Sequence, residues 1–328
     1  MKAKMNRKTT VALRNMLSCA ALATAAAVAM SSPAFAADTA KKATAAKASA
    51  QKAYATPEEL FQALVDAAKA NDSKALNALL GPKGDALLHS GDAVADKQRA
   101  EKFAADYAAK HSVTKNGDAK ATLVVGSDDW PMPIPAVKGA KGWTLDTAAG
   151  SREILARRIG RNELDAIQVV QAVVDAQRDY ASEDRDANGV RDYARKFLST
   201  PGKKDGLYWP TKEGEPPSPL GPLVVQASGE GYKGKSGTPT PYHGYYFRML
   251  TAQGKDAKGG ALSYVVQGRM IGGFAVLAYP AQYGNSGIMS FIANYDGTVY
   301  QKDLGDKTAE VARAMKAYNP DSSWKEVK

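Results

Sequence analysis

The chain has 328 residues, one cysteine and a formal net charge of +10, from 44 Lys and Arg against 34 Asp and Glu. Most of the basic excess lies near the N-terminus: residues 1–36 hold five basic and no acidic residues, and residues 37–55 hold four basic residues and one acidic, which leaves 35 against 33 for the rest. This balance argues against nucleic acid as a partner, and the lone Cys19 excludes an intramolecular disulfide.

Residues 1–36 have the three-part layout of a secretory signal peptide. Five basic residues accompany an apolar run from Met16 to Met30, and small residues before Ala37 mark a cleavage site after Ala36. Residues 37–55, with nine alanines, predict a solvated linker. No later stretch approaches the roughly 20 apolar residues that span a membrane. We therefore expect export to the periplasm or the extracellular space, with no transmembrane segment in the mature chain.

Residues 56–150 predict an N-terminal α+β domain. Thr56-Pro-Glu-Glu59 is typical of a helix start with a capping box and a proline in the first turn. The strands that follow read as a small antiparallel sheet, and the glycines of 138–142 join the last two as a hairpin. The expected elements are helices over 56–68, 73–80 and 93–110 and strands over 121–125, 130–137 and 143–146.

Residues 151–328 predict a second α+β domain, in which one apolar helix packs on an antiparallel sheet. An arginine-rich short helix over 151–161 is expected to break at Gly160, after which Asn162 caps a second helix that runs to Tyr180. The proline- and glycine-rich residues 210–241 predict a loop with at most one short helix. The expected strands are 245–251, 263–267, 274–279, 288–294 and 298–302, followed by a closing helix over 308–318.

Two resemblances extend this description. A helix across an antiparallel sheet resembles the globular head of type IV pilin-like proteins, although the apolar half of the pilin helix is absent. Further motifs cover nearly the whole mature chain; they include Ile159-Gly-Arg-Asn-Glu163, Tyr180-Ala-Ser-Glu-Asp184, Asp205-Gly-Leu-Tyr-Trp209, Thr240-Pro-Tyr-His-Gly-Tyr-Tyr-Phe247 and Gly268-Arg-Met-Ile-Gly-Gly-Phe274. These motifs resemble the bacterial domain of unknown function 2950 family. That resemblance implies no activity and transfers no catalytic residue.

The loop over residues 184–192 matches the first half of a calcium-binding loop. Asp184, Asp186, Asn188 and Asp192 occupy positions one, three, five and nine, glycine occupies position six, and Val190 at position seven offers a backbone carbonyl. Position twelve holds arginine instead of a bidentate glutamate. The pattern predicts at most a weak calcium site and no other cofactor. The alternative is an Asx-rich turn whose acids pair with neighbouring arginines.

Aromatic residues surround His243, which is the one candidate for acid or base chemistry. We expect Tyr208, Trp209, Tyr242, His243 and Tyr245 to line a groove that stacks on sugar rings or grips a peptide. The alternative is that these aromatic residues belong to the core and its edge, since strands favour them. No other residue stands out as catalytic.

The sequence thus favours a non-enzymatic binding or structural component of the bacterial envelope, with another envelope protein or cell-wall glycan as candidate partner. Two alternatives stay open: an envelope hydrolase of glycan or peptide that uses the groove near His243, and a small-ligand carrier that uses the first domain. A deep pocket that holds His243 beside a carboxylate would favour the enzyme, and an exposed apolar strip without a pocket would favour the binding module.

Overall fold

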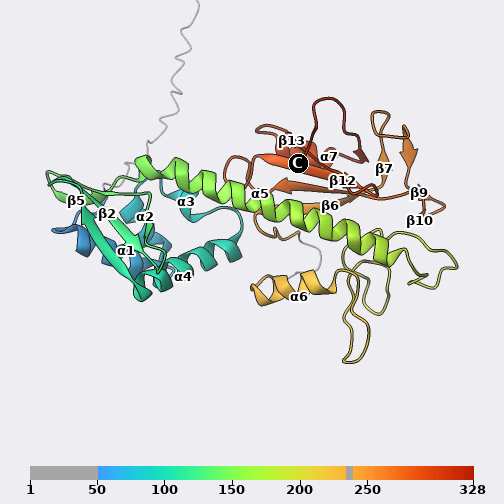
Figure 1. Cartoon of the computed structure of the whole chain (residues 1–328), viewed down its shortest axis with the longest axis horizontal. Helices are drawn as coiled ribbons and strands as arrows, with labels where there is room; N and C mark the ends of the chain where they lie inside the picture. The colour runs from blue at the N-terminus through green and yellow to red at the C-terminus, as the bar shows by residue number, and fades with distance from the viewer. Residues whose placement is uncertain (1–50, 234–238) are drawn as a thin grey trace, which may run out of the picture. The chain divides into compact units, whose positions relative to one another are not determined.

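The structure, a computed structural model, describes residues 51–233 and 239–328 (Figure 1). The expected signal peptide and residues 37–50 of the expected linker lie outside these ranges. Residues 51–55 are bound to the elements that follow: Gln51 Nε2 donates to the backbone oxygens of Leu79 and Leu145, each at 3.0 Å, and Tyr54 pairs with Trp143. The last five residues of the expected linker therefore belong to the folded part.

The first helices begin at side-chain caps. The Thr56 side-chain oxygen accepts a hydrogen bond from Glu59 N at 3.2 Å, and Asp72 and Asp92 cap the next two expected helices. The expected helices are confirmed to within one residue at each end. A fourth, short helix has no side-chain cap, which explains why no pattern predicted it. These helices are α1 (Pro57–Lys69), α2 (Ser73–Leu80), α3 (Asp85–Leu88) and α4 (Ala93–Ala109).

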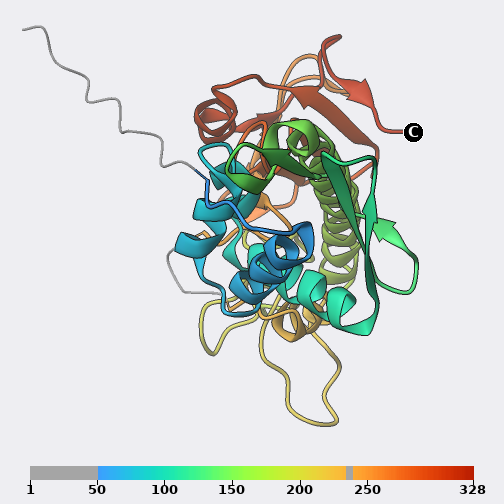
Figure 2. The same cartoon turned by 90° about the vertical axis from the view of Figure 1, so that its left-hand side faces the viewer.

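An antiparallel sheet follows in the order β1-β2-β4-β5, with β3 paired to β2. Figure 2 shows the helices, blue to teal, beside the green strands, and α1, α2 and α4 contact the sheet. The single strand expected over 130–137 is wrong: it is two short strands, because Pro133 and Pro135 cannot donate to a ladder. The strands are β1 (His111–Lys115), β2 (Lys120–Val125), β3 (Trp130–Pro131), β4 (Ala136–Gly139) and β5 (Gly142–Leu145).

Helix α5 (Thr147–Tyr180) is one continuous helix of 34 residues. The expected break at Gly160 is wrong, because a single glycine inside a helix costs only about 1 kcal/mol relative to alanine. Asn162, expected as a cap, lies within the helix, and its side-chain amide donates to Ser286 O at 2.8 Å. Like every other helix in the described residues, α5 falls short of the combined length and apolarity that a membrane crossing requires.

The second sheet has the antiparallel order β15-β13-β12-β11-β6, and α5 packs against β11, β12 and β13 (Figure 1). Four of its strands match the expected ones to within one residue. The closing helix α7 (Thr308–Ala314) is shorter than expected, because residues 317–318 pair with β7 as a strand. The strands of this sheet are β6 (Tyr245–Leu250), β11 (Ala275–Pro280), β12 (Met289–Asn294), β13 (Val299–Asp303) and β15 (Lys325–Glu326).

Smaller elements complete this half of the chain. The one short helix expected within 210–241 is α6, and the strand expected over 263–267 is instead split between two short pairings. These elements are α6 (Gly221–Gly229), β7 (Ala252–Gln253), β8 (Leu262–Ser263), β9 (Val265–Val266), β10 (Arg269–Met270) and β14 (Ala317–Tyr318).

The hydrophobic core forms two clusters. One lies among α1, α2, α4 and the first sheet and includes Leu60, Phe61 and Leu123; the other lies between α5 and the second sheet and includes Val170 and Phe291. Helices and antiparallel sheets together confirm the α+β class. The division into two domains near residue 150 stays a prediction, although α5 crosses that position without interruption.

Candidate functional site

His243 lies between two carboxylates that reach it from different elements. Its Nδ1 atom is 2.7 Å from Asp165 Oδ2, and its Nε2 atom is 2.7 Å from Glu230 Oε2. Asp165 belongs to α5, Glu230 directly follows α6, and His243 sits in the turn that leads into β6. Carboxylate oxygens only accept hydrogen bonds, so both ring nitrogens donate and the ring carries a positive charge.

The ionisation of this cluster follows from its contacts. Burial lowers the pKa of His243, but the hydrogen bonds to Asp165 and Glu230 outweigh burial and the net shift is upward. The pKa of Glu230 moves the other way: burial is the largest single cause and raises it, but the hydrogen bond and charge of His243, together with hydrogen bonds from Gln226 and Tyr242, lower it, and the net shift is downward. The ring therefore stays charged to a higher pH than a free histidine.

Two tyrosine rings pack against the imidazole. The ring centroids of Tyr242 and His243 are 4.1 Å apart, and those of Tyr232 and His243 are 5.9 Å apart with a 23° angle between the planes. Burial is the main cause that raises the pKa of both phenols, and the nearby carboxylates Asp92 and Glu230 add to it. Both hydroxyls therefore stay protonated near neutral pH.

Asp92 ties this turn to the helix α4. It is almost fully buried, and its Oδ1 atom accepts from Ala95 N at 3.1 Å as the cap of that helix. Its Oδ2 atom accepts from Tyr232 Oη and from Gly244 N, each at 2.8 Å. His243 and Gly244 both adopt the left-handed conformation, with φ of 49° and 76°. One carboxylate thus stabilises a helix end and a strained turn that is 152 residues away.

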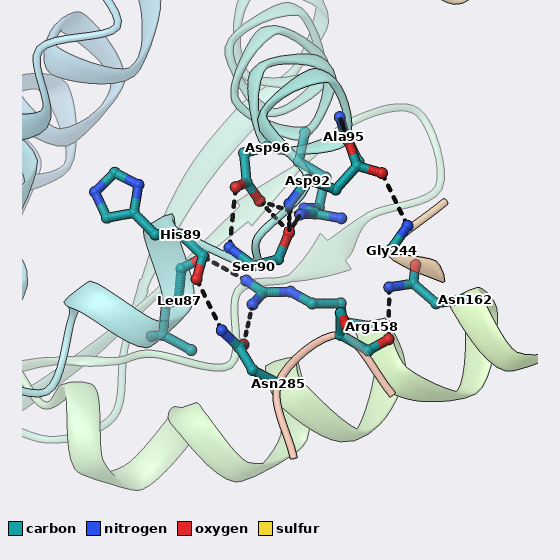
Figure 3. A network of polar contacts seen from close by, with 12 residues as sticks. Leu87, His89, Ser90, Asp92, Ala95, Asp96, Arg158, Asn162, Gly244 and Asn285 are labelled. Carbon is teal, nitrogen blue, oxygen red and sulfur yellow. Dashed lines mark hydrogen bonds and ion pairs between the residues drawn. The ribbon is translucent and has the colours of Figure 1, made fainter. Parts of the chain in front are cut away.

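Arg158 is the centre of a second polar network, drawn with Asp92 in Figure 3. Its guanidinium donates to Ala86 O at 2.8 Å, to Leu87 O and to Asn285 Oδ1 at 2.6 Å. Asn285 in turn donates to His89 O at 2.7 Å. These bonds join α5, the helix α3 with the residue after it, and the turn before β12, so the network holds backbone segments that no strand pairing connects.

The His243 cluster meets only part of the description of a catalytic site. A histidine acts as a base through a ring nitrogen that can accept a proton. Both nitrogens of His243 already donate to carboxylates, so neither is free to accept a proton from a substrate. The geometry instead suits a half-buried ion cluster that fixes the turn before β6.

The five residues expected to line one groove do not come together. Tyr242 contacts His243, but Tyr245 is fully buried and its hydroxyl donates to Met289 O at 2.9 Å. Tyr208 pairs with the strand-like segment at Leu198, and Trp209 is nearly buried with its ring 6.4 Å from that of Tyr180. Alternation along β6 explains Tyr245, since successive side chains of a strand point to opposite faces.

A cavity of about 760 Å³ lies beside Tyr242, between α5, α6 and β6. This volume falls within the range of about 300–1,000 Å³ that is usual for small-molecule sites. Of the charged residues on its wall, Lys196 is paired with Asp205 at 2.7 Å. The walls are mainly apolar and aromatic, and include Val169, Val173, Leu223, Val224, Tyr246 and Phe247.

The acidic loop over 184–192 is internally hydrogen-bonded. Asp184 accepts from the backbone N–H groups of Asn188 and the following glycine at 3.0 and 2.9 Å, and Asn188 Oδ1 accepts from Val190 N at 2.9 Å. The Asn188 amide also donates to Asp192 at 3.3 Å, while Asp186 is exposed. Over residues 51–233 and 239–328, no group of three or more His, Cys, Asp or Glu side chains could hold a metal ion. The calcium site stays a prediction, and calcium would compete with these bonds.

Sequence reasoning missed the residues that give His243 its environment. Asp165 and Glu230 are 78 and 13 residues away from it in the chain, and Asp92 is farther still. One signal was present: Asp165 breaks the apolar face of the long helix, and an acid at such a place often has a buried partner. No pattern in the chain indicates which partner that is.

The comparisons with known proteins identify the family. The family model described as "Protein of unknown function (DUF2950)" matches residues 51–327, so the chain belongs to this family. No curated protein and no solved structure matches the chain. The pilin-like head is therefore not confirmed and stays a prediction.

Proposed function

We propose that this member of the DUF2950 family is an exported, non-enzymatic binding protein that holds a small apolar ligand in the cavity between α5, α6 and β6. The observation that carries the proposal is the size of this cavity, about 760 Å³, together with its apolar walls. The proposal places the ligand in the C-terminal half, whereas the small-ligand carrier expected from the sequence used the first domain.

The walls favour an apolar ligand over a sugar or a peptide. Val169 and Val173 of α5 face Leu223 and Val224 of α6 across the cavity, and Phe247 of β6 closes it. Burial of apolar surface contributes about 25 cal/mol per Å², so a ligand that covers these side chains gains free energy without specific polar bonds. A sugar would need several free polar partners, whereas Lys196, Ser199 and Thr200 on this wall already form hydrogen bonds within the protein.

The hydrogen bonds of His243 support a binding role rather than a catalytic one. Tyr232 and Tyr242 both line the cavity and pack against the His243 ring. This ring is bonded to Asp165 and Glu230 through both nitrogens. A hydrolase would require one of these bonds to break before each proton transfer, and this cost disfavours the envelope hydrolase as the main alternative.

Binding of the neutral fluorophore 1-aminoanthracene, measured by its fluorescence, tests the cavity. Val224 lines the cavity, and its neighbour Val225 on the same helix is 70% exposed and does not. Val224→Trp should fill the space and weaken binding at least about tenfold, whereas Val225→Trp should leave it unchanged. Absence of saturable binding by the unmodified protein, or equal effects of the two variants, would overturn the proposal.

Export has its own test. The signal-peptide pattern predicts that the mature protein begins at Ala37. The intact mass of the protein recovered from the periplasm or the medium should correspond to residues 37–328. A protein found only in the cytoplasm with its first 36 residues attached would contradict export and leave the cavity test unaffected.

A further inference from the structure

A second cleft, distinct from the apolar cavity, lies between α4, the turn after β2 and α5. Its volume is about 580 Å³. Basic side chains of α4 and α5 line it, and those of α5 lie on one side of that helix, because residues 157 and 161 are four positions apart. The basic residues on its wall are Arg99, Lys102, Arg157, Arg158 and Arg161.

Carboxylates neutralise only part of this charge. Lys102 pairs with Asp106 at 2.9 Å, while Arg99 and Arg157 pair with acids on their own helices. Asp128 also lines the cleft. In the described residues neither Arg158 nor Arg161 forms an ion pair with a carboxylate. The guanidinium groups of Arg158 and Arg161 therefore face only one further acid, Asp128, and the cleft keeps a net positive charge.

Arg158 indicates that the cleft is built around an anion. The residue is 3% exposed, yet its hydrogen-bond partners are carbonyl oxygens rather than a carboxylate. Its Nε atom is buried and has no hydrogen-bond partner among the described residues. Burial, with Arg99 nearby, lowers the pKa of Arg158 to about 10. Asp96 opposes part of this shift, but its carboxylate pairs with Arg99. A buried cation that has no paired carboxylate of its own is destabilised, and an anion in the cleft would reduce that cost.

The rest of the wall includes apolar side chains, and one of them holds a cation in position. Phe103 of α4 and Ile154 of α5 flank the basic residues, and Trp130, 36% exposed, is the first residue of β3. The Arg157 guanidinium lies 5.7 Å from the Trp130 ring centroid and pairs with Glu153 on its other side. A side chain fixed in this way loses little conformational entropy when it binds.

We propose that this cleft binds an organic anion, with a carboxylate or phosphate head on an apolar body. The exposed guanidinium of Arg161 matches carboxylate and phosphate oxygens in a two-point geometry. The terminal nitrogens of Arg158 already bond protein oxygens, so Arg158 offers its Nε–H as one further donor. Phe103, Ile154 and Trp130 cover the apolar body. The ligand differs in class from the neutral apolar molecule proposed for the first cavity, so the two proposals stand on separate residues.

Isothermal titration calorimetry with 2-naphthoate, 1-naphthyl phosphate and the neutral 2-naphthamide tests this proposal on the mature protein. We expect saturable binding of at least one anion and binding of the amide that is at least about tenfold weaker. The tighter of the two anions identifies the head group. Val224→Trp, which blocks the other cavity, should leave anion binding unchanged.

Two arginine variants separate a site from general charge attraction. Arg161→Gln removes an exposed cleft cation and should weaken anion binding about tenfold. Arg152→Gln makes the same charge change on the same helix, at an exposed residue outside the cleft, and should have no effect. The proposal is overturned if neither anion binds saturably, if the amide binds as tightly as the anions, or if the two variants weaken binding equally.

Discussion

Replacement of Gly160 by alanine should stabilise the protein, because α5 is continuous through this residue. Gly160 lies in the helix interior at an exposed position, and a Cβ built on it meets no atom within 4 Å. Glycine in a helix interior costs about 0.5–1 kcal/mol relative to alanine. No contact opposes the gain, so Gly160→Ala should raise the free energy of unfolding by about this amount.

Gly150 in the same helix is the matched control. A Cβ there would lie 2.4 Å from Pro133 O and 2.7 Å from Ile134 N. Both are backbone atoms, which cannot turn aside as a flexible side chain does. Overpacking of this kind typically costs about 1–3 kcal/mol, which exceeds the gain in helix propensity. Gly150→Ala should therefore destabilise the protein.

Urea unfolding followed by circular dichroism measures both effects. With a slope of about 2–3 kcal/mol per M, the gain in Gly160→Ala corresponds to a rise in the midpoint of about 0.2–0.5 M. The Gly150→Ala midpoint should fall. A lower midpoint for Gly160→Ala would mean that the helix breaks at residue 160, as the residue pattern alone predicts. A similar rise for both variants would mean that Gly150 does not contact the loop, and either result refutes the reasoning.

The turn before β6 and the acidic loop 184–192 offer three more tests. Because the folded pKa of His243 is raised, its contribution is complete below the unfolded value of about 6.5 and is lost as pH rises through the folded value. His243→Gln should cost about 2 kcal/mol near pH 6 and progressively less as the pH rises through the raised folded pKa; a pH-independent difference in urea unfolding would contradict this. Gly244→Ala, with φ of 76° and a Cβ that would lie 2.5 Å from Asn162 Nδ2, should cost about 1–3 kcal/mol, and an unchanged Tm would count against the strain. Since Asp184 and Asp192 already accept hydrogen bonds, Tm should be the same in calcium and in chelator; a calcium-dependent rise would support the predicted calcium site.

Local signals predicted most of the regular structure. Thr56 and the acids after it located the start of α1, and short runs of mostly apolar residues located β11 and β12 to within one residue. These signals act between residues a few positions apart, so a single sequence contains them in full. The prediction of a break at Gly160 is wrong because it used local signals alone. Contacts with residues far along the chain, made by Arg158 and Asn162, help to keep the helix continuous, and no local pattern shows them.

The candidate sites depend on such distant contacts. The sequence shows His243 as a histidine among aromatic residues. Its raised pKa and its hydrogen bonds depend on Asp165 and Glu230, which lie far from it in the chain. The arginine-rich residues 151–161 predict only a short helix, whereas Arg158 is buried and lines a cleft. Charged residues are mostly exposed in folded proteins, so a sequence alone predicts that each of them is exposed. Only the fold shows which of them is buried.

The continuity of α5 also bears on how the protein unfolds. The N-terminal part of the helix packs Ile154 against one hydrophobic cluster, and the C-terminal part contributes Val170 and Val173 to the other. To melt either cluster alone, the helix would have to fray up to its middle and lose the backbone hydrogen bonds on that side. The shared helix therefore couples the two clusters into one cooperative unit. Gly160, between the two packed segments, is the residue at which that cooperativity is weakest.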